Sequence, residues 1–123
     1  MKAVANREDV IAIEARGPHA ELPCSTWEMI RRGAAIDPAA PALTFFARAD
    51  DYREAMTWRY AELLDCITRA ANAFHALGIQ PGEVVASVLP NLPETHFTVW
   101  GAQAVGIVGA VNPQLEADSI AGI

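Results

Sequence analysis

The chain has little positive charge and almost no lysine. Nine Lys and Arg side chains face fifteen Asp and Glu, which gives a formal net charge of -6, and Lys2 is the only lysine among 123 residues. A surface that binds nucleic acid needs clustered cations to neutralise phosphates, so the composition argues against a nucleic-acid partner. It also leaves a lysine-assisted phosphoryl or adenylyl transfer without its lysine, because Lys2 lies in the N-terminal arm.

Cysteine and long apolar runs are scarce as well. Cys24 and Cys66 form no CxxC pair and no metal-ligand spacing, which is typical of two ordinary thiols in a reduced compartment. Residues 1–17 contain no apolar stretch long enough for the core of a signal peptide. Proline, glycine or charge breaks every apolar stretch well before the roughly 18 residues that a membrane span requires. We therefore predict a cytoplasmic protein without a transmembrane segment.

Recognisable catalytic motifs are missing too. The chain has no GxxxxGK[ST] or GxGxxG phosphate loop, and His19, His75 and His96 have no second ligand at a metal-binding spacing. Ser87 lacks the G-x-S-x-G turn that exposes a nucleophile, so we interpret it as a packed core serine. Cys66 has no histidine one turn away. The sequence therefore assigns no catalytic, cofactor-binding or metal-binding residue.

What the chain does contain is an ordered series of structural patterns. Residues 1–25 show no steady period and predict an irregular arm. Ser25 or Thr26 can cap a short helix that stops before Asp37-Pro38. Residues 42–47 and 56–58 then predict an antiparallel hairpin, joined by the charged and solvated loop 48–54.

The strongest periodic signal predicts a long amphipathic helix that ends at Gly78, a residue suited to the left-handed conformation. Arg59 precedes its first tyrosine and offers no capping oxygen, so we expect Thr57 to be the N-cap. The apolar residues recur three or four apart along one face: Tyr60, Leu63, Leu64, Ile67, Ala71, Phe74 and Leu77.

Residues 84–89 form an apolar run that predicts a strand buried on both faces of a parallel sheet. Pro93 can open the next helix, for which we expect Phe97, Trp100 and Ala104 to form the buried stripe. Gly106 ends that helix, residues 107–111 predict a second strand, and a further helix begins near Glu116. The order strand, helix, strand defines a βαβ unit, so the fold class is α/β.

Short motifs recur in a fixed order along this framework. They are Pro41-Ala42-Leu43, Trp58, Tyr60-Ala61-Glu62-Leu63-Leu64, Ala71-Asn72, Leu77-Gly78, Gly82-Glu83-Val84-Val85-Ala86, Leu89-Pro90-Asn91-Leu92-Pro93-Glu94, Trp100-Gly101-Ala102 and Asn112-Pro113. In this series the chain, from about Thr26 to its end, resembles the N-terminal region of AMP-forming acyl-CoA synthetases, members of the adenylate-forming ligase superfamily.

The resemblance implies that residues 26–123 are a truncated N-terminal portion of the AMP-binding domain. It would be a partial subdomain of the ligase large domain, with a hairpin and a long helix before the βαβ unit. In such enzymes a carboxylate attacks the α-phosphorus of Mg-ATP to give an acyl-adenylate, and the thiol of coenzyme A then displaces AMP. The family's phosphate loop and catalytic lysine have no counterpart among these residues, so ATP, Mg and coenzyme A are implied only for the full-length family.

Three functions remain open at this point. The first is a non-catalytic scaffold, completed by the remainder of a ligase that acts on a fatty or other hydrophobic acid. The second is a small α/β interaction module, and the third is a self-sufficient binding domain that uses the strand ends. The scaffold predicts exposed apolar surface and self-association, the module a defined complex, and the binding domain a monodisperse monomer with a ligand.

Overall fold

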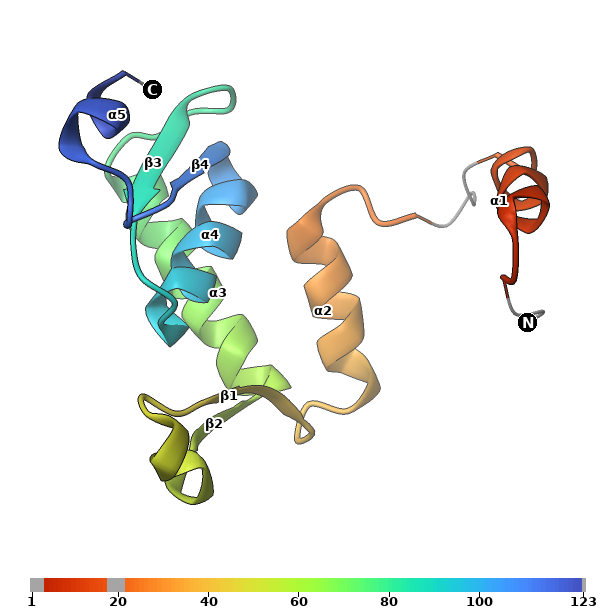
Figure 1. Ribbon diagram of the computed structural model, residues 1–123, viewed down its shortest axis with the longest axis horizontal. Helices are drawn as coiled ribbons and strands as arrows, with labels where there is room; N and C mark the ends of the chain where they lie inside the picture. The colour runs from red at the N-terminus through yellow and green to blue at the C-terminus, as the bar shows by residue number, and fades with distance from the viewer. Residues whose placement is uncertain (1–3, 18–21, 123) are drawn as a thin grey trace.

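The computed structural model describes residues 4–17 and 22–122 and confirms the α/β fold class (Figure 1). From residue 26 on, a hairpin and two α-helices precede a strand, helix, strand unit, as the sequence predicts. The elements are α1 Arg7–Glu14, α2 Thr26–Ile36, β1 Pro41–Phe45, the 3-10 helix η1 Ala49–Glu54, β2 Met56–Arg59, α3 Tyr60–Ala76, β3 Val84–Val88, α4 Pro93–Val105, β4 Ile107–Val111 and α5 Ala117–Ala121.

Helix α1 corrects the prediction that the whole arm of residues 1–25 is irregular. The Asn6 side chain accepts a hydrogen bond from the Asp9 backbone N–H at 2.9 Å, and the Asp9 carboxylate accepts one from the Ala5 N–H at 3.1 Å. The first bond satisfies an N–H group that a helix start leaves unpaired, and the second ties the residue before the N-cap to the first turn. The helix is eight residues long and has no buried residue. Its sequence therefore lacks the repeating apolar positions from which a helix can be predicted. The division at residue 25 stays a prediction.

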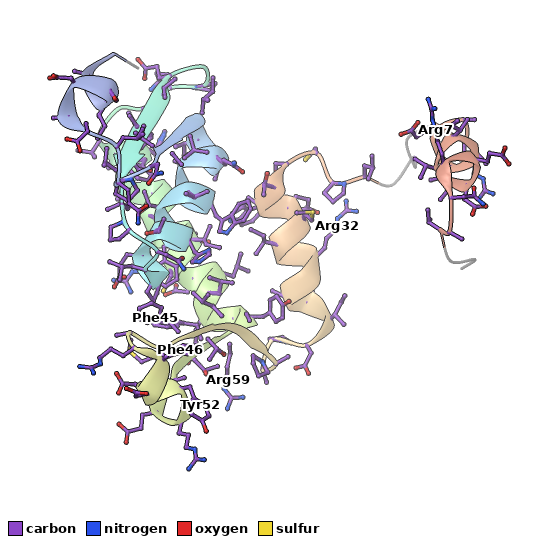
Figure 2. The ribbon with its side chains drawn as sticks, in the orientation of Figure 1. Arg7, Arg32, Phe45, Phe46, Tyr52 and Arg59 are labelled. Atoms are coloured by element: carbon purple, nitrogen blue, oxygen red, sulfur yellow. The ribbon has the colours of Figure 1, made fainter. Side chains whose placement is uncertain are left out.

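The helix at Ser25 and the hairpin are confirmed. Ser25 Oγ accepts the Glu28 backbone N–H at 3.1 Å, and α2 ends immediately before Asp37. Strands β1 and β2 pair antiparallel, with Thr44 opposite Thr57. The predicted loop contains η1, and Figure 2 shows Phe46 and Tyr52 at this end of the hairpin, 47% and 54% exposed.

Helix α3 buries the face that the sequence predicts. Ile67 is fully buried and Ala71 nearly so, whereas Leu77 at the C-terminal end is exposed. Gly78 follows with φ +91°, in the left-handed region. The expected N-cap was wrong: the helix starts after Arg59, whose backbone N–H donates to Glu62 Oε2 at 2.8 Å. A side chain inside the first turn thus accepts the backbone N–H of the N-cap residue, which is the reciprocal half of a capping box.

Helices α3 and α4 pack through small residues. A β-carbon on Gly101 would lie 2.7 Å from Ala70 Cβ and 2.9 Å from the Ala71 backbone N, closer than real β-carbons approach. Ala102 is fully buried beside it. The prediction of a stripe through Ala104 was wrong, because Ala104 is exposed. The larger Phe97 and Trp100 flank the contact and are only half-buried.

The strands β3 and β4 are parallel neighbours, with Val84 opposite Ile107 and Val88 opposite Val111. Parallel pairing across α4 confirms the strand, helix, strand unit. Ser87 is buried, as predicted. The expectation of a strand covered on both faces was wrong within the described residues: Val84, Val88 and Ile107 are 58%, 47% and 51% exposed. Alternation places these three side chains on one side of the sheet.

We predict that Gly101→Ala destabilises the chain by about 1–3 kcal/mol, because the added methyl group forces α4 away from α3. Gln103→Ala, an exposed position in the same helix, is the matched control and should change stability by less than about 0.5 kcal/mol. Urea unfolding followed by circular dichroism measures both. Equal stabilities of the two variants would show that the helices can separate at Gly101 without cost.

Candidate functional site

A shallow cleft of about 620 Å³ lies where both parallel strands end. The carboxyl ends of β3 and β4 lead into two proline-containing loops, and the first turn of α4 closes one side. Thr95 Oγ1 donates to the Pro90 carbonyl, and Asn112 Oδ1 accepts the Gln114 backbone N–H at 3.0 Å, so both loops are held locally. The lining residues are Leu89, Pro90, Asn91, Thr95, Asn112, Pro113 and Gln114.

The chemistry of this strand-end cleft is neutral. Amide and hydroxyl groups of Asn91, Asn112, Gln114 and Thr95 can donate and accept hydrogen bonds, and proline and leucine supply apolar surface. None of these lining residues is a cation that could meet a phosphate group, as phosphate sites usually provide. The cleft therefore has the usual position of a ligand site in an open α/β sheet, without the charge that a triphosphate requires.

A second groove, of about 460 Å³, lies between β2 and the start of α3 and is lined by Trp58, Ala61, Glu62, Asp65 and Cys66. The Trp58 ring meets Phe97 of α4 edge-on, with ring centroids 5.8 Å apart. Burial raises the pKa of the Cys66 thiol, and the neighbouring Asp65 carboxylate raises it further. Both effects favour the protonated thiol, which agrees with the interpretation of Cys66 as an unreactive cysteine.

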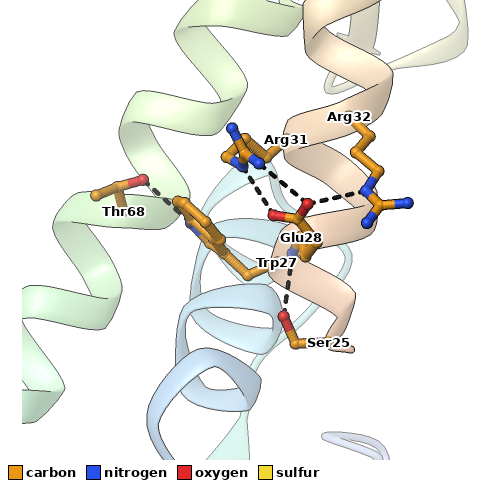
Figure 3. A network of polar contacts seen from close by, with 6 residues as sticks. All are labelled: Ser25, Trp27, Glu28, Arg31, Arg32 and Thr68. Carbon is orange, nitrogen blue, oxygen red and sulfur yellow. Dashed lines mark hydrogen bonds and ion pairs between the residues drawn. The ribbon is translucent and has the colours of Figure 1, made fainter. Parts of the chain in front are cut away.

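An arginine–glutamate network lies in the first turns of α2, beside Trp27 (Figure 3). Glu28 accepts hydrogen bonds from Arg31 at 2.8 and 3.0 Å and from Arg32 at 2.8 Å. The bonds from Arg31, then those from Arg32, lower the pKa of Glu28 from 4.5 to about 2. Sequence analysis missed this network, although the spacing of three and four residues after Glu28 is a signal for it.

Trp27 attaches the same helix to α3. Its indole N–H donates to Thr68 Oγ1 at 3.4 Å, and the Arg31 guanidinium lies 5.8 Å from the ring centroid (Figure 3). Thr68 Oγ1 in turn donates to the Leu64 carbonyl at 2.7 Å. These contacts fix α2 on the α3–α4 pair, so the network has a structural role.

The structure does not gather the chemically capable residues named by sequence. His75 is exposed on α3, His96 is half-buried on α4, and Lys2 and His19 lie outside the described residues. Among residues 4–17 and 22–122, no three His, Cys, Asp or Glu side chains are grouped so that they could hold a metal ion. The helices in this part of the chain include none long and apolar enough to span a membrane. The absence of site residues stays a prediction.

The profile of AMP-binding enzymes matches residues 30–123. This chain belongs to the AMP-binding enzyme family. It is 38% identical to the marinolic acid–CoA ligase of a Pseudoalteromonas species, over 98% of this chain and 18% of that protein. It is 49% identical to the crotonobetaine/carnitine–CoA ligase of Proteus mirabilis, over 40% of this chain and 10% of that protein.

Solved structures of the family have the same fold. Acetoacetyl-CoA synthetase from Streptomyces lividans superposes with a TM-score of 0.70 at 29% identity, over 78% of this chain and 15% of that chain. The Mycobacterium tuberculosis fatty acyl CoA synthetase superposes with a TM-score of 0.64 at 25% identity, over 78% of this chain and 18% of that chain. The chain thus spans less than a fifth of each of these relatives. It is similar to the N-terminal part of proteins named as CoA ligases and CoA synthetases, as the motifs predicted.

Full-length members of this family imply ATP, Mg and coenzyme A. The strand-end cleft of this chain does not fit the triphosphate or its metal ion, because its lining residues include no cation and no carboxylate. The exposed Asp50 and Asp51 lie in η1, on the hairpin and not on the β3–β4 unit. We therefore derive no catalytic step from these residues.

We predict that Cys66 reacts with a thiol reagent at least about tenfold more slowly than the exposed Cys24 near neutral pH, since burial hinders access and raises the pKa of Cys66. Absorbance kinetics with a disulfide reagent, using Cys24→Ser and Cys66→Ser as single-thiol variants, separate the two rates. In denaturant the rates should converge. A faster Cys66 in the folded chain would instead identify an activated thiol.

We predict a pH-dependent contribution of Glu28 to stability. A depressed folded pKa stabilises the folded chain above the unfolded value near 4.5, and this contribution is lost as pH falls toward about 2. Glu28→Gln should therefore be less stable than the parent at pH 6, and the difference should shrink between pH 4.5 and 2. Urea midpoints across this range test it. A pH-independent difference would assign the effect of the substitution to something other than ionisation.

Proposed function

We propose that this chain is the supporting, non-catalytic N-terminal part of an ATP-dependent ligase that joins a hydrophobic carboxylic acid to coenzyme A through an acyl-adenylate. One observation carries the supporting role: the β3–β4 sheet is covered by helices on one side only. Val84, Val88 and Ile107 remain about half exposed on the other side. Family membership supplies the reaction class, and the uncharged strand-end cleft argues against a triphosphate site here.

The uncovered side of the sheet is the natural place for the remainder of a ligase domain. Burying apolar surface stabilises a protein by about 25 cal/mol per Å². Three half-exposed aliphatic side chains on one side of the sheet therefore favour packing against another apolar surface. Gly109 lies on the same side and has no side chain, which brings its neighbour Val84 close: a β-carbon there would lie 3.1 Å from Val84 Cγ1. The result is a smooth apolar surface suited to close packing. In isolation the same surface would favour self-association.

A hydrophobic acid is the substrate class that we favour. A solved neighbour at 25% identity is named a fatty acyl CoA synthetase, whereas other relatives are named for acetoacetate and for crotonobetaine or carnitine. We also propose a cytoplasmic location, supported by two cysteines that remain free thiols. The competing function is a small α/β interaction module, which the same uncovered side of the sheet would serve.

We predict no saturable heat when the purified chain is titrated with Mg-ATP, together with self-association in size-exclusion chromatography with light scattering. Val88→Lys should shift the chain toward monomer, because it places a charge on the apolar side of the sheet. Ala73→Lys, at an exposed position of α3, is the matched control and should leave association unchanged.

The outcomes separate the functions. Saturable nucleotide binding by a monodisperse monomer would contradict the scaffold and indicate a self-sufficient binding domain. Co-purification of the parent chain, but not of Val88→Lys, in a fixed ratio with one different protein would favour the interaction module. If neither substitution changes self-association, the surface that mediates it lies away from the β3–β4 sheet.

A further inference from the structure

The β1–β2 hairpin lies at the end of the molecule where α3 begins (Figure 1). Each of residues 41–59 is half-buried or exposed, and the hairpin reaches α4 through the Trp58 ring, which meets Phe97. We propose that the hairpin and the first turn of α3 form one strap, which opens as a unit while the α3–α4 pair stays folded, and that Arg59 latches it. This inference is independent of the proposed function.

The loop before the hairpin caps the start of α3 with its backbone. The Pro38 carbonyl accepts the Ala61 backbone N–H at 3.0 Å, and the Ala40 carbonyl accepts the Tyr60 N–H at 3.1 Å. The first N–H groups of a helix have no partner within it, so these two carbonyls supply acceptors that α3 needs. The first turn of α3 therefore depends on a segment that precedes the hairpin.

Arg59 completes the same contact with its side chain. Its guanidinium Nη1 donates to the Ala39 carbonyl at 2.8 Å, so the consecutive carbonyls of residues 38–40 all accept from residues 59–61. We call these two short segments the joint. A hydrogen bond from a charged donor is stronger than a neutral one, and this bond, unlike the two backbone bonds, can be removed by a side-chain substitution. Arg59 is therefore the latch of the joint.

The loop holds its row of carbonyls without help from the hairpin. Asp37 Oδ1 accepts the Ala39 N–H at 3.1 Å, and the Asp37 carbonyl accepts the Ala40 N–H at 3.2 Å. Pro38 and Pro41 have no N–H and a fixed φ. These bonds are local and use the N–H groups of the loop, so its shape persists when the strap moves. The joint is thus the place where the strap separates from the loop.

The hairpin and the first turn of α3 share Arg59. It is the last residue of β2 and pairs with Pro41, the first residue of β1. Its backbone N–H also donates to Glu62 Oε2 in the first turn of α3, at 2.8 Å. Segments with few buried side chains and exposed hydrogen bonds open at a lower free energy than the core. Loss of the joint should therefore release both elements together.

Native-state amide exchange of the parent chain at low urea concentrations, followed by NMR, tests the strap without any substitution. The amides of Tyr60 and Ala61 and the protected amides of the hairpin should share one opening equilibrium and one urea dependence. They should exchange at least about tenfold faster than the amide of Ile67, which is buried in α3.

Arg59→Met tests the latch. It should raise the shared opening equilibrium by about tenfold, because it removes a charge-assisted hydrogen bond, and it should leave the exchange of Ile67 unchanged. Arg53→Met is the matched control: Arg53 is an exposed arginine of the same hairpin, where it donates to Tyr52 and lies outside the joint. This control should leave the opening equilibrium of the strap unchanged.

Each outcome decides the proposal. One shared opening that responds to Arg59→Met and not to Arg53→Met supports it. Different urea dependences for the hairpin and for the first turn of α3 in the parent chain would overturn the strap, since they would reveal two units. Faster exchange of Ile67 together with the joint in Arg59→Met would assign the joint to global unfolding and contradict the proposal. An opening equilibrium that Arg59→Met leaves unchanged would rule out Arg59 as the latch.

Discussion

Helices α3 and α4 approach so closely at Gly101 that only hydrogen fits between their backbones. This contact sets the height at which α4 crosses α3, and α4 leads directly into β4. Gly106, at the end of α4, is tight as well, since a β-carbon there would lie 2.7 Å from the Glu83 carbonyl. Two glycines thus fix both where the helix packs and where the chain returns to the sheet.

Helix α2, the β1–β2 hairpin and the β3–β4 sheet attach to this pair of helices. Helix α2 is held through Trp27 and Thr68, and the hairpin through Trp58, whose ring meets Phe97. The β3–β4 sheet packs against the same helices on one side, and on the other side Val84, Val88 and Ile107 are about half exposed. The described part of the chain is therefore built around a helical core, with a sheet that is only partly buried. This is consistent with a chain that spans 18% of a related CoA ligase.

Much of this fold is readable from sequence because the signals are local. Proline, glycine and the period of three or four predict the bounds of α2 and α4 and the end of α3, and apolar runs predict β3 and β4. The errors concern tertiary context. Ala104 was expected in the core, yet the contact uses Gly101 and Ala102, because the face of α4 that packs on α3 is rotated away from Ala104. The burial of β3 was overestimated, because an apolar run does not specify which element packs against the strand. The strand-end cleft could not be predicted, because it forms only where the loop that contains Asn91 meets the loop that contains Asn112 in the fold.

Native-state amide hydrogen exchange, resolved by residue, tests the dependence of the fold on the α3–α4 contact most directly. The account predicts the slowest exchange around Ile67–Ala71 of α3 and Gly101–Ala102 of α4, with β3 and β4 exchanging at least about tenfold faster, because their cover is incomplete. Slower exchange in the β3–β4 sheet than in these helices would contradict the account. It would show that the sheet, and not the helical contact, is the most stable unit of this chain.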